Sequence, residues 1–114
     1  MLTACAATTT AKTNEEVVAE RAQAKWTAIV AGDYQAAYQY MSPSSRTVIS
    51  EQAYRNSMKP GFHKGAKVVG VKCESADICE VRLEIEYEYA GSRVKAGLPE
   101  KWIKQDGNWW YPQV

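Results

Sequence analysis

The feature that most constrains this chain is a long run, from Cys79 to Tyr89, in which apolar and charged side chains alternate. Successive side chains of a β-strand point to opposite faces, so this period of two predicts a long antiparallel strand with one wet face. The inward residues are expected to be Cys79, Val81, Leu83, Ile85, Tyr87 and Tyr89, and the outward carboxylates Glu80, Glu84, Glu86 and Glu88. Such a strand needs partner strands and a layer that covers its apolar face.

Cys73 and Cys79 flank a short polar segment between two stretches of β character, which predicts a hairpin. The register that pairs the cysteines also places apolar residues opposite one another: Val71 with Val81 and Val69 with Leu83. Directly opposed residues lie within the Cα separation that a disulfide accepts. We therefore expect a Cys73–Cys79 disulfide. The alternative is two buried free thiols.

A second hairpin is expected near the end of the chain. Residues 95–105 predict a third strand, with Gly97 and Pro99 marking a bulge or an edge at its start. Asp106-Gly107 is typical of a type I′ turn. The chain then returns as a last strand over residues 108–111.

Helical signals precede all of the strands. Thr13 and Glu16 have the spacing of a capping box, and Gly32 is a typical C-terminal stop, so a helix is expected over residues 14–31. Its apolar stripe is Val18, Ala22, Trp26, Ile29 and Val30.

Two shorter helices should follow. Asp33 is expected to cap the first, which carries Tyr34, Ala37, Tyr38 and Met41 along one side. Ser50 can cap the other, over residues 51–58. Because helices precede strands, the fold class is α+β, with N-terminal helices packed on an antiparallel sheet.

The length of the chain indicates a single domain, and its charge indicates that the domain has no strong electrostatic field. The chain has 114 residues, and 14 Lys plus Arg against 13 Asp plus Glu give a formal net charge of +1. This balance disfavours a nucleic-acid partner. No apolar run has the roughly 18 residues needed to span a bilayer. We divide the chain into residues 1–13, a tether, and residues 14–114, one α+β domain.

Met1-Leu2-Thr3-Ala4-Cys5 resembles a lipobox, at which a bacterial signal peptide is cut before a lipidated cysteine. The basic and apolar regions of a full signal peptide are missing from this sequence. The resemblance implies lipidation of Cys5, a tether over residues 6–13, and a location at the periplasmic face of a bacterial membrane, with Ala6 favouring the outer membrane. The alternative is a chance cysteine in a tail.

The Gly32-Asp33 junction between helices and the closing pattern from Trp102 through Asp106-Gly107 to Trp110 resemble the nuclear transport factor 2-like superfamily. The resemblance covers roughly residues 14–112. It implies a curved sheet wrapped around a long helix to form a cone with an apolar mouth. The superfamily includes isomerases, dehydratases and many non-enzymatic domains, so the fold alone does not identify the function.

Catalytic candidates are few. Asp33 is interpreted as a helix cap, His63 as a solvated loop residue, and Ser44-Ser45 as lacking a histidine and carboxylate partner. The inward positions assigned above contain no acid or base that could transfer a proton. The Cys-x5-Cys spacing and the single histidine also disfavour a metal site, and no cofactor is expected.

The aromatic residues are more informative than the catalytic candidates, because the chain has four Trp and seven Tyr. Those expected to point inward, as core or as the lining of a pocket, are Trp26, Tyr38, Tyr87, Tyr89 and Trp102. The preferred hypothesis is a non-catalytic, lipid-anchored accessory domain of the cell envelope that binds an envelope protein or a small apolar ligand. A homodimer is a further candidate assembly. The alternatives are a small isomerase or dehydratase using the cone and a purely structural envelope component.

Overall fold

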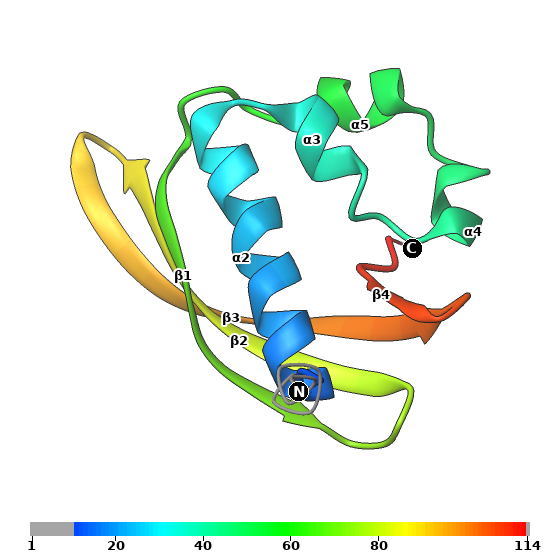
Figure 1. Cartoon of the computed structure of the whole chain (residues 1–114). Coiled ribbons are helices and arrows are strands. Elements are labelled where there is room, and N and C mark those ends of the chain that lie inside the picture. Colours follow the sequence, from blue (N-terminus) through cyan, green and yellow to red (C-terminus); the bar gives the residue numbers. More distant parts are fainter. Residues whose placement is uncertain (1–10, 114) are drawn as a thin grey trace, which may run out of the picture.

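The computed structural model describes residues 11–113 and places helices on one face of a single sheet (Figure 1). The helices are α2 (Asn14–Ala31), α3 (Tyr34–Tyr38), α4 (Pro43–Arg46) and α5 (Glu51–Asn56). The strands are β1 (His63–Cys73), β2 (Ile78–Tyr89), β3 (Ser92–Gln105) and β4 (Asn108–Trp110). The predicted α+β class is therefore confirmed.

The sheet has the order β1-β2-β3-β4, and every neighbouring pair is antiparallel. It curves around α2, while α3, α4 and α5 gather on the far side of that helix (Figure 1). The apolar side chains of α2 and of the concave sheet face meet in one core, which is closed by Trp102 and Trp109. Within residues 11–113, no helix is long and apolar enough to cross a membrane.

The long helix begins and ends where the sequence predicts. Thr13 accepts a hydrogen bond from the backbone N–H of Glu16, whose side chain accepts one from Thr13 in return, so the capping box is confirmed. Gly32 ends the helix with a φ of 79°, a left-handed conformation that glycine adopts without steric cost. Gln23 also holds α2 against the sheet, because its side-chain amide bonds the backbone of Ala66 and Val68 at the free edge of β1.

The short helices differ from the prediction at their ends. Asp33 caps α3 as expected, by accepting from Ala36, but α3 ends at Tyr38 and α5 ends at Asn56 rather than at residue 58. The helix α4 was not predicted. Ser42 caps it and Pro43 occupies its first turn, where the missing proline N–H has no consequence.

The β1–β2 pairing confirms part of the predicted register. Cys73 pairs with Cys79 and Val71 with Val81, but Val68, not Val69, lies opposite Leu83. An irregularity between Val68 and Gly70 inserts one extra residue. The bulge turns Val69 to the outer face, where it is 56% exposed. β1 begins at His63 and ends at Cys73.

The β2–β3 pairing runs unbroken from Ile78 opposite Ile103 to Tyr89 opposite Ser92. The third strand therefore begins three residues earlier than predicted, and no bulge occurs near Gly97 and Pro99. The alternative prediction, an edge, is confirmed, because β4 pairs only with residues 103–105 and leaves this part of β3 without a second neighbour. The closing turn has positive φ at both Asp106 and Gly107, as a type I′ turn requires.

Candidate functional site

A buried ion pair lies between α2 and β3. The Nζ atom of Lys25 is 2.7 Å from Oε2 of Glu100, and their side chains are only 4% and 3% exposed. The prediction that no acid or base points inward is therefore wrong. It failed because Trp102 was the only residue of β3 assigned to the inner face, and Glu100, two residues before it, was not considered.

Two indoles complete the environment of the carboxylate. The Nε1 atom of Trp26 donates to Oε2 of Glu100 at 3.1 Å, and Nε1 of Trp102 donates to Oε1 at 2.8 Å. With the ammonium of Lys25, three donors converge on one buried carboxylate. Hydrogen bonds to charged acceptors are stronger than neutral ones, so this arrangement offsets much of the cost of burial.

The ammonium of Lys25 also lies on the face of an aromatic ring. Its Nζ atom is 3.3 Å from the ring centroid of Tyr111, which permits a cation–π interaction. Burial lowers the pKa of Lys25 below its usual value, and the charge of Glu100 opposes this effect. Lys25 and Glu100 thus compensate each other, and the pair adds no net charge to the interior.

A sequence signal for both residues existed and was missed. Lys25 lies three residues after Ala22 and four before Ile29, so it falls on the apolar stripe of α2. Counting back by two from Trp102 places Glu100 on the inner face of β3. A charged residue at each of two inward positions predicts a buried pair, since an isolated buried charge is costly.

The ion pair lies beside a cavity of about 560 Å³. The cavity is formed by α2, α5, β3 and the segment after β4. The residues that line it are Lys25, Trp26, Ile29, Tyr54, Ser57, Met58, Leu98, Pro99, Glu100, Lys101, Tyr111, Pro112 and Gln113. Its volume lies in the range typical of small-molecule sites.

Two phenols give the cavity a polar element besides the ion pair. Among residues 11–113, no side chain bonds the hydroxyl of Tyr54 or Tyr111, and no fully buried polar side-chain atom lacks a partner. Neither hydroxyl is therefore fully buried, and both side chains line the cavity. Burial raises the pKa of both phenols, and the nearby charge of Glu100 raises it further, so both stay protonated at neutral pH.

The apolar walls and the paired charges define what the cavity can hold. Ile29, Met58, Leu98 and Pro112 supply hydrocarbon surface around the two hydroxyls. An uncharged, largely apolar molecule with one hydroxyl or carbonyl oxygen matches this lining. A charged ligand would lose hydration without finding a free counter-ion at the ion pair, which is unfavourable. The other charged residue of the lining, Lys101, occupies an outward position of β3 opposite Glu80.

Of the five aromatic residues predicted to point inward, three are buried. Trp26 lines the cavity, Trp102 is fully buried behind Glu100, and Tyr38 donates to the backbone oxygen of Ile49 at 2.5 Å. Tyr87 is half-buried and stacks on Phe62 outside the cavity.

The interpretation of Tyr89 as an inward residue is wrong, because its side chain is 69% exposed. It is the last residue of β2, directly before the turn at Ala90 and Gly91. The alternation of the strand continues to Tyr89, but the layer of helices does not extend that far along the hairpin (Figure 1).

The remaining catalytic candidates do not join the cavity. His63 is the first residue of β1 rather than a solvated loop residue, and its ring meets Trp26 and Phe62 edge to face. Ser45 is buried and bonds the backbone of Gln113, which holds Gln113 beside α4.

Cys73 and Cys79 form a disulfide in the first hairpin, as predicted. The pair closes a short loop at the end of β1, and neither cysteine lines the cavity. Cys5, the predicted lipidation site, lies outside the described residues.

Comparisons with known proteins identify the fold only. No protein-family model matches the chain, and no curated protein matches it. A SEC-C motif containing protein from Psychrobacter arcticus superposes with a TM-score of 0.71 and 12% identity, over 90% of this chain and 62% of that one. This chain therefore spans less than two thirds of that protein.

Two further structures are similar. A SEC-C motif containing protein from Rhodopseudomonas palustris has a TM-score of 0.61 and 16% identity, over 78% of this chain and 70% of that one. The CaMKII hub homology domain of Chlamydomonas reinhardtii has a TM-score of 0.54 and 20% identity, over 85% of this chain and 92% of that one. These likenesses agree with the α+β architecture and are consistent with a nuclear transport factor 2-like fold.

Proposed function

We propose that this chain is a non-catalytic binding domain of the bacterial cell envelope and that its ligand occupies the cavity beside Lys25 and Glu100. The observation that carries the binding role is the cavity lining. It combines apolar walls, two tyrosine side chains whose hydroxyls have no partner among residues 11–113, and an ion pair whose charges cancel. The ligand class that fits is an uncharged, mainly apolar molecule with one hydroxyl or carbonyl oxygen.

Ring compounds that differ only in charge test this role. Cyclohexanol and cyclohexanone are expected to bind with dissociation constants on the order of 1 mM, and cyclohexanecarboxylate and cyclohexylamine at least tenfold more weakly. Ligand-observed NMR measures all four. Tighter binding of either charged analogue in the cavity would contradict the assignment.

A substitution that fills the mouth of the cavity tests whether the ligand binds there. Leu98 is 41% exposed and lines the cavity, so Leu98→Trp should abolish binding without unfolding the domain. Val48 is 82% exposed and lies outside the cavity, so Val48→Trp is the matched control and should leave binding intact. Binding that survives Leu98→Trp places the ligand elsewhere.

The envelope location rests on chemistry at the cysteines. A disulfide such as Cys73–Cys79 persists in oxidising compartments such as the periplasm. The lipobox-like sequence before Cys5 supports a lipid anchor at the periplasmic face of the outer membrane. Intact mass of the native gene product, expressed in its host, should show a lipid on Cys5; an unmodified protein recovered from the cytoplasm contradicts the location.

The proposal includes protein partners as well as the membrane. An envelope protein or a second copy of the chain would use surface outside the cavity, and sedimentation velocity at micromolar concentration tests the homodimer. The alternative is a purely structural envelope component, whose cavity binds no ligand. Binding of cyclohexanol or cyclohexanone would favour the binding domain, and absence of binding would favour the structural component.

The second candidate function is a small isomerase or dehydratase, and the ionisable pair inside the cavity favours it. Against it, Glu100 already accepts three hydrogen bonds, so it is poorly placed to act as a free base. A base in the cavity would exchange the α-protons of cyclohexanone for deuterium in heavy water. We expect no exchange above buffer; exchange that disappears in Glu100→Gln would establish the enzyme.

A further inference from the structure

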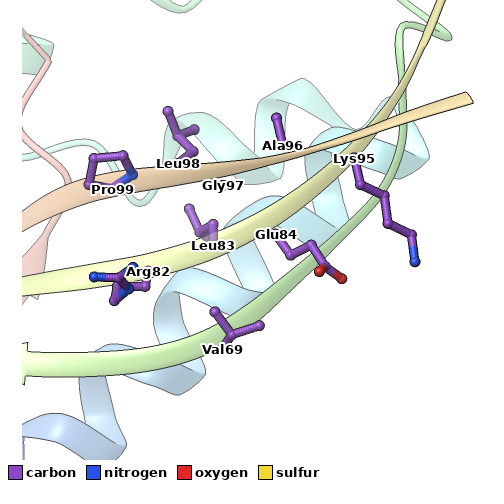
Figure 2. Close-up of a pocket in the computed structure, with 9 residues that line it drawn as sticks. All are labelled: Val69, Arg82, Leu83, Glu84, Lys95, Ala96, Gly97, Leu98 and Pro99. Atoms are coloured by element: carbon purple, nitrogen blue, oxygen red, sulfur yellow. The ribbon is translucent and has the colours of Figure 1, made fainter.

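A second hollow lies on the outer face of the sheet, which points away from α2 (Figure 2). It has a volume of about 400 Å³. Three adjacent strands line it: β1 through Val69, β2 through residues 82–84 and β3 through residues 95–99. The hollow shares Leu98 and Pro99 with the first cavity but lies on the opposite face of β3.

Two local features of the backbone produce this hollow. The bulge between Val68 and Gly70 raises the side chain of Val69 on one side of it. On the other side, Gly97 leaves the surface of β3 bare, and a Cβ atom added there would meet nothing within 4 Å. The result is a depression with an apolar wall.

Arg82 interrupts a regular pattern of charges on this face. Glu80 lies opposite Lys72 on β1 and opposite Lys101 on β3, so its carboxylate has a cation on each side. Arg82, the next outward residue, lies opposite Gly70 and Pro99 and therefore has no charged cross-strand neighbour.

The guanidinium of Arg82 is also without an ion-pair partner. Across residues 11–113, no carboxylate lies within 4.0 Å of its nitrogens. Its planar donors can bind one carboxylate through two parallel hydrogen bonds. The other charges of the hollow are Lys95 and Glu84, so two cations and one carboxylate leave an excess of one positive charge.

We propose that this hollow binds a monocarboxylate that carries a small apolar group. The carboxylate pairs with Arg82, and the apolar group packs between Val69 and Pro99 over the bare backbone of Gly97. The free carboxyl end of a polypeptide and a free branched acid both have this chemistry. The site is independent of the cavity at Glu100, so either proposal can fail alone.

The test is a titration of ¹⁵N-labelled protein followed by NMR, with the Gly97 amide and the Arg82 Nε as reporters. N-acetyl-L-valine represents a polypeptide end, and isovalerate represents a free acid. Each should give saturable shifts, and the tighter of the two identifies the source. N-acetyl-L-valinamide, which lacks the carboxylate, and acetate, which lacks the apolar group, should each bind at least fivefold more weakly.

Protein variants separate charge from shape. Arg82→Gln should abolish the shifts, and Gly97→Val should abolish them by filling the hollow while it keeps the guanidinium. Arg93→Gln is the matched control, because Arg93 is an exposed arginine of the same sheet face that pairs with Glu86 outside the hollow. It should bind as the wild type does.

Three results would overturn the proposal. Binding could survive Arg82→Gln or Gly97→Val. N-acetyl-L-valinamide or inorganic phosphate could bind as tightly as N-acetyl-L-valine. Finally, the reporter signals could shift with protein concentration in the absence of ligand, which would assign this face to a second copy of the chain.

Discussion

Lys25 on α2 and Glu100 on β3, 75 residues apart in the sequence, form a buried ion pair whose Nζ and Oε2 atoms are 2.7 Å apart. The pair joins the long helix to the strand it covers and forms the floor of the cavity. Removing one partner leaves the other charge buried and alone. Its energetics are therefore distinct from those of a surface salt bridge.

Single substitutions of the pair should be far more destabilising than the double substitution. Lys25→Met or Glu100→Leu alone is expected to cost about 3–5 kcal/mol in the free energy of unfolding, measured with urea. Lys25→Met combined with Glu100→Leu should recover most of this loss, because no unpaired charge remains. Arg55→Met, which breaks the exposed pair with Glu51, is the control and should cost less than about 1 kcal/mol. Additive losses in the double variant would contradict this account.

His63 should titrate below the ordinary histidine range. Burial lowers its pKa from 6.5, so the folded protein prefers the neutral ring, and the unfolded chain binds more protons as the pH falls below 6.5. Stability is therefore expected to fall as the pH drops from 6.5 towards the pKa of the folded state.

This titration is readily measured, because His63 is the only histidine of the chain. Its imidazole resonances give the pKa directly. His63→Gln should flatten the dependence of Tm on pH between 7 and 5. A midpoint at 6.5 would show a solvated ring, as the sequence interpretation held, and a midpoint at or above 6.5 would contradict the lowering by burial.

The disulfide should stabilise the hairpin rather than the whole domain. Cys73 and Cys79 are six residues apart, and closing so short a loop contributes about 2 kcal/mol. The double variant Cys73→Ala, Cys79→Ala should lose about that amount and keep its circular dichroism spectrum. Cys79→Ser should lose more stability than Cys73→Ser. Cys79 is fully buried, so the hydroxyl of the serine that replaces it would be removed from water. If reduction of the disulfide alone unfolds the protein, the disulfide stabilises the whole domain, and this prediction is wrong.

Two aromatic residues of one predicted face should behave in opposite ways. Trp102 is fully buried and donates to Glu100, so Trp102→Ala is expected to cost about 3–5 kcal/mol or more. Tyr89 is 69% exposed, so Tyr89→Ala should change the free energy of unfolding by less than about 0.5 kcal/mol. Chemical denaturation of both variants measures the difference; similar losses would contradict the burial described here.

Much of the fold was predictable because it depends on local patterns. The bounds of α2 follow from Thr13 and Gly32, and the alternation of β2 fixes the face and register at Cys73 and Cys79. These signals need no knowledge of distant residues.

The parts that were missed depend on tertiary contacts or on one inserted residue. The bulge beside Val69 shifts the rest of β1 by one position, and its one local sign is Gly70, a glycine inside the strand. Tyr89 follows the alternation but extends beyond the helical layer. The pairing of Lys25 with Glu100 was within reach of pattern analysis, but only if charged residues were allowed on apolar faces.

The most direct test of the central claim is a titration with cyclohexanol that observes the four tryptophan indole N–H resonances. Those of Trp26 and Trp102 donate to Glu100 at the floor of the cavity, whereas that of Trp110 donates to the backbone of Gln105 away from it. The account predicts saturable shifts of Trp26 and Trp102, with Trp110 unchanged. Unchanged Trp26 and Trp102 resonances at 20 mM cyclohexanol, about 20 times the expected dissociation constant, would contradict it.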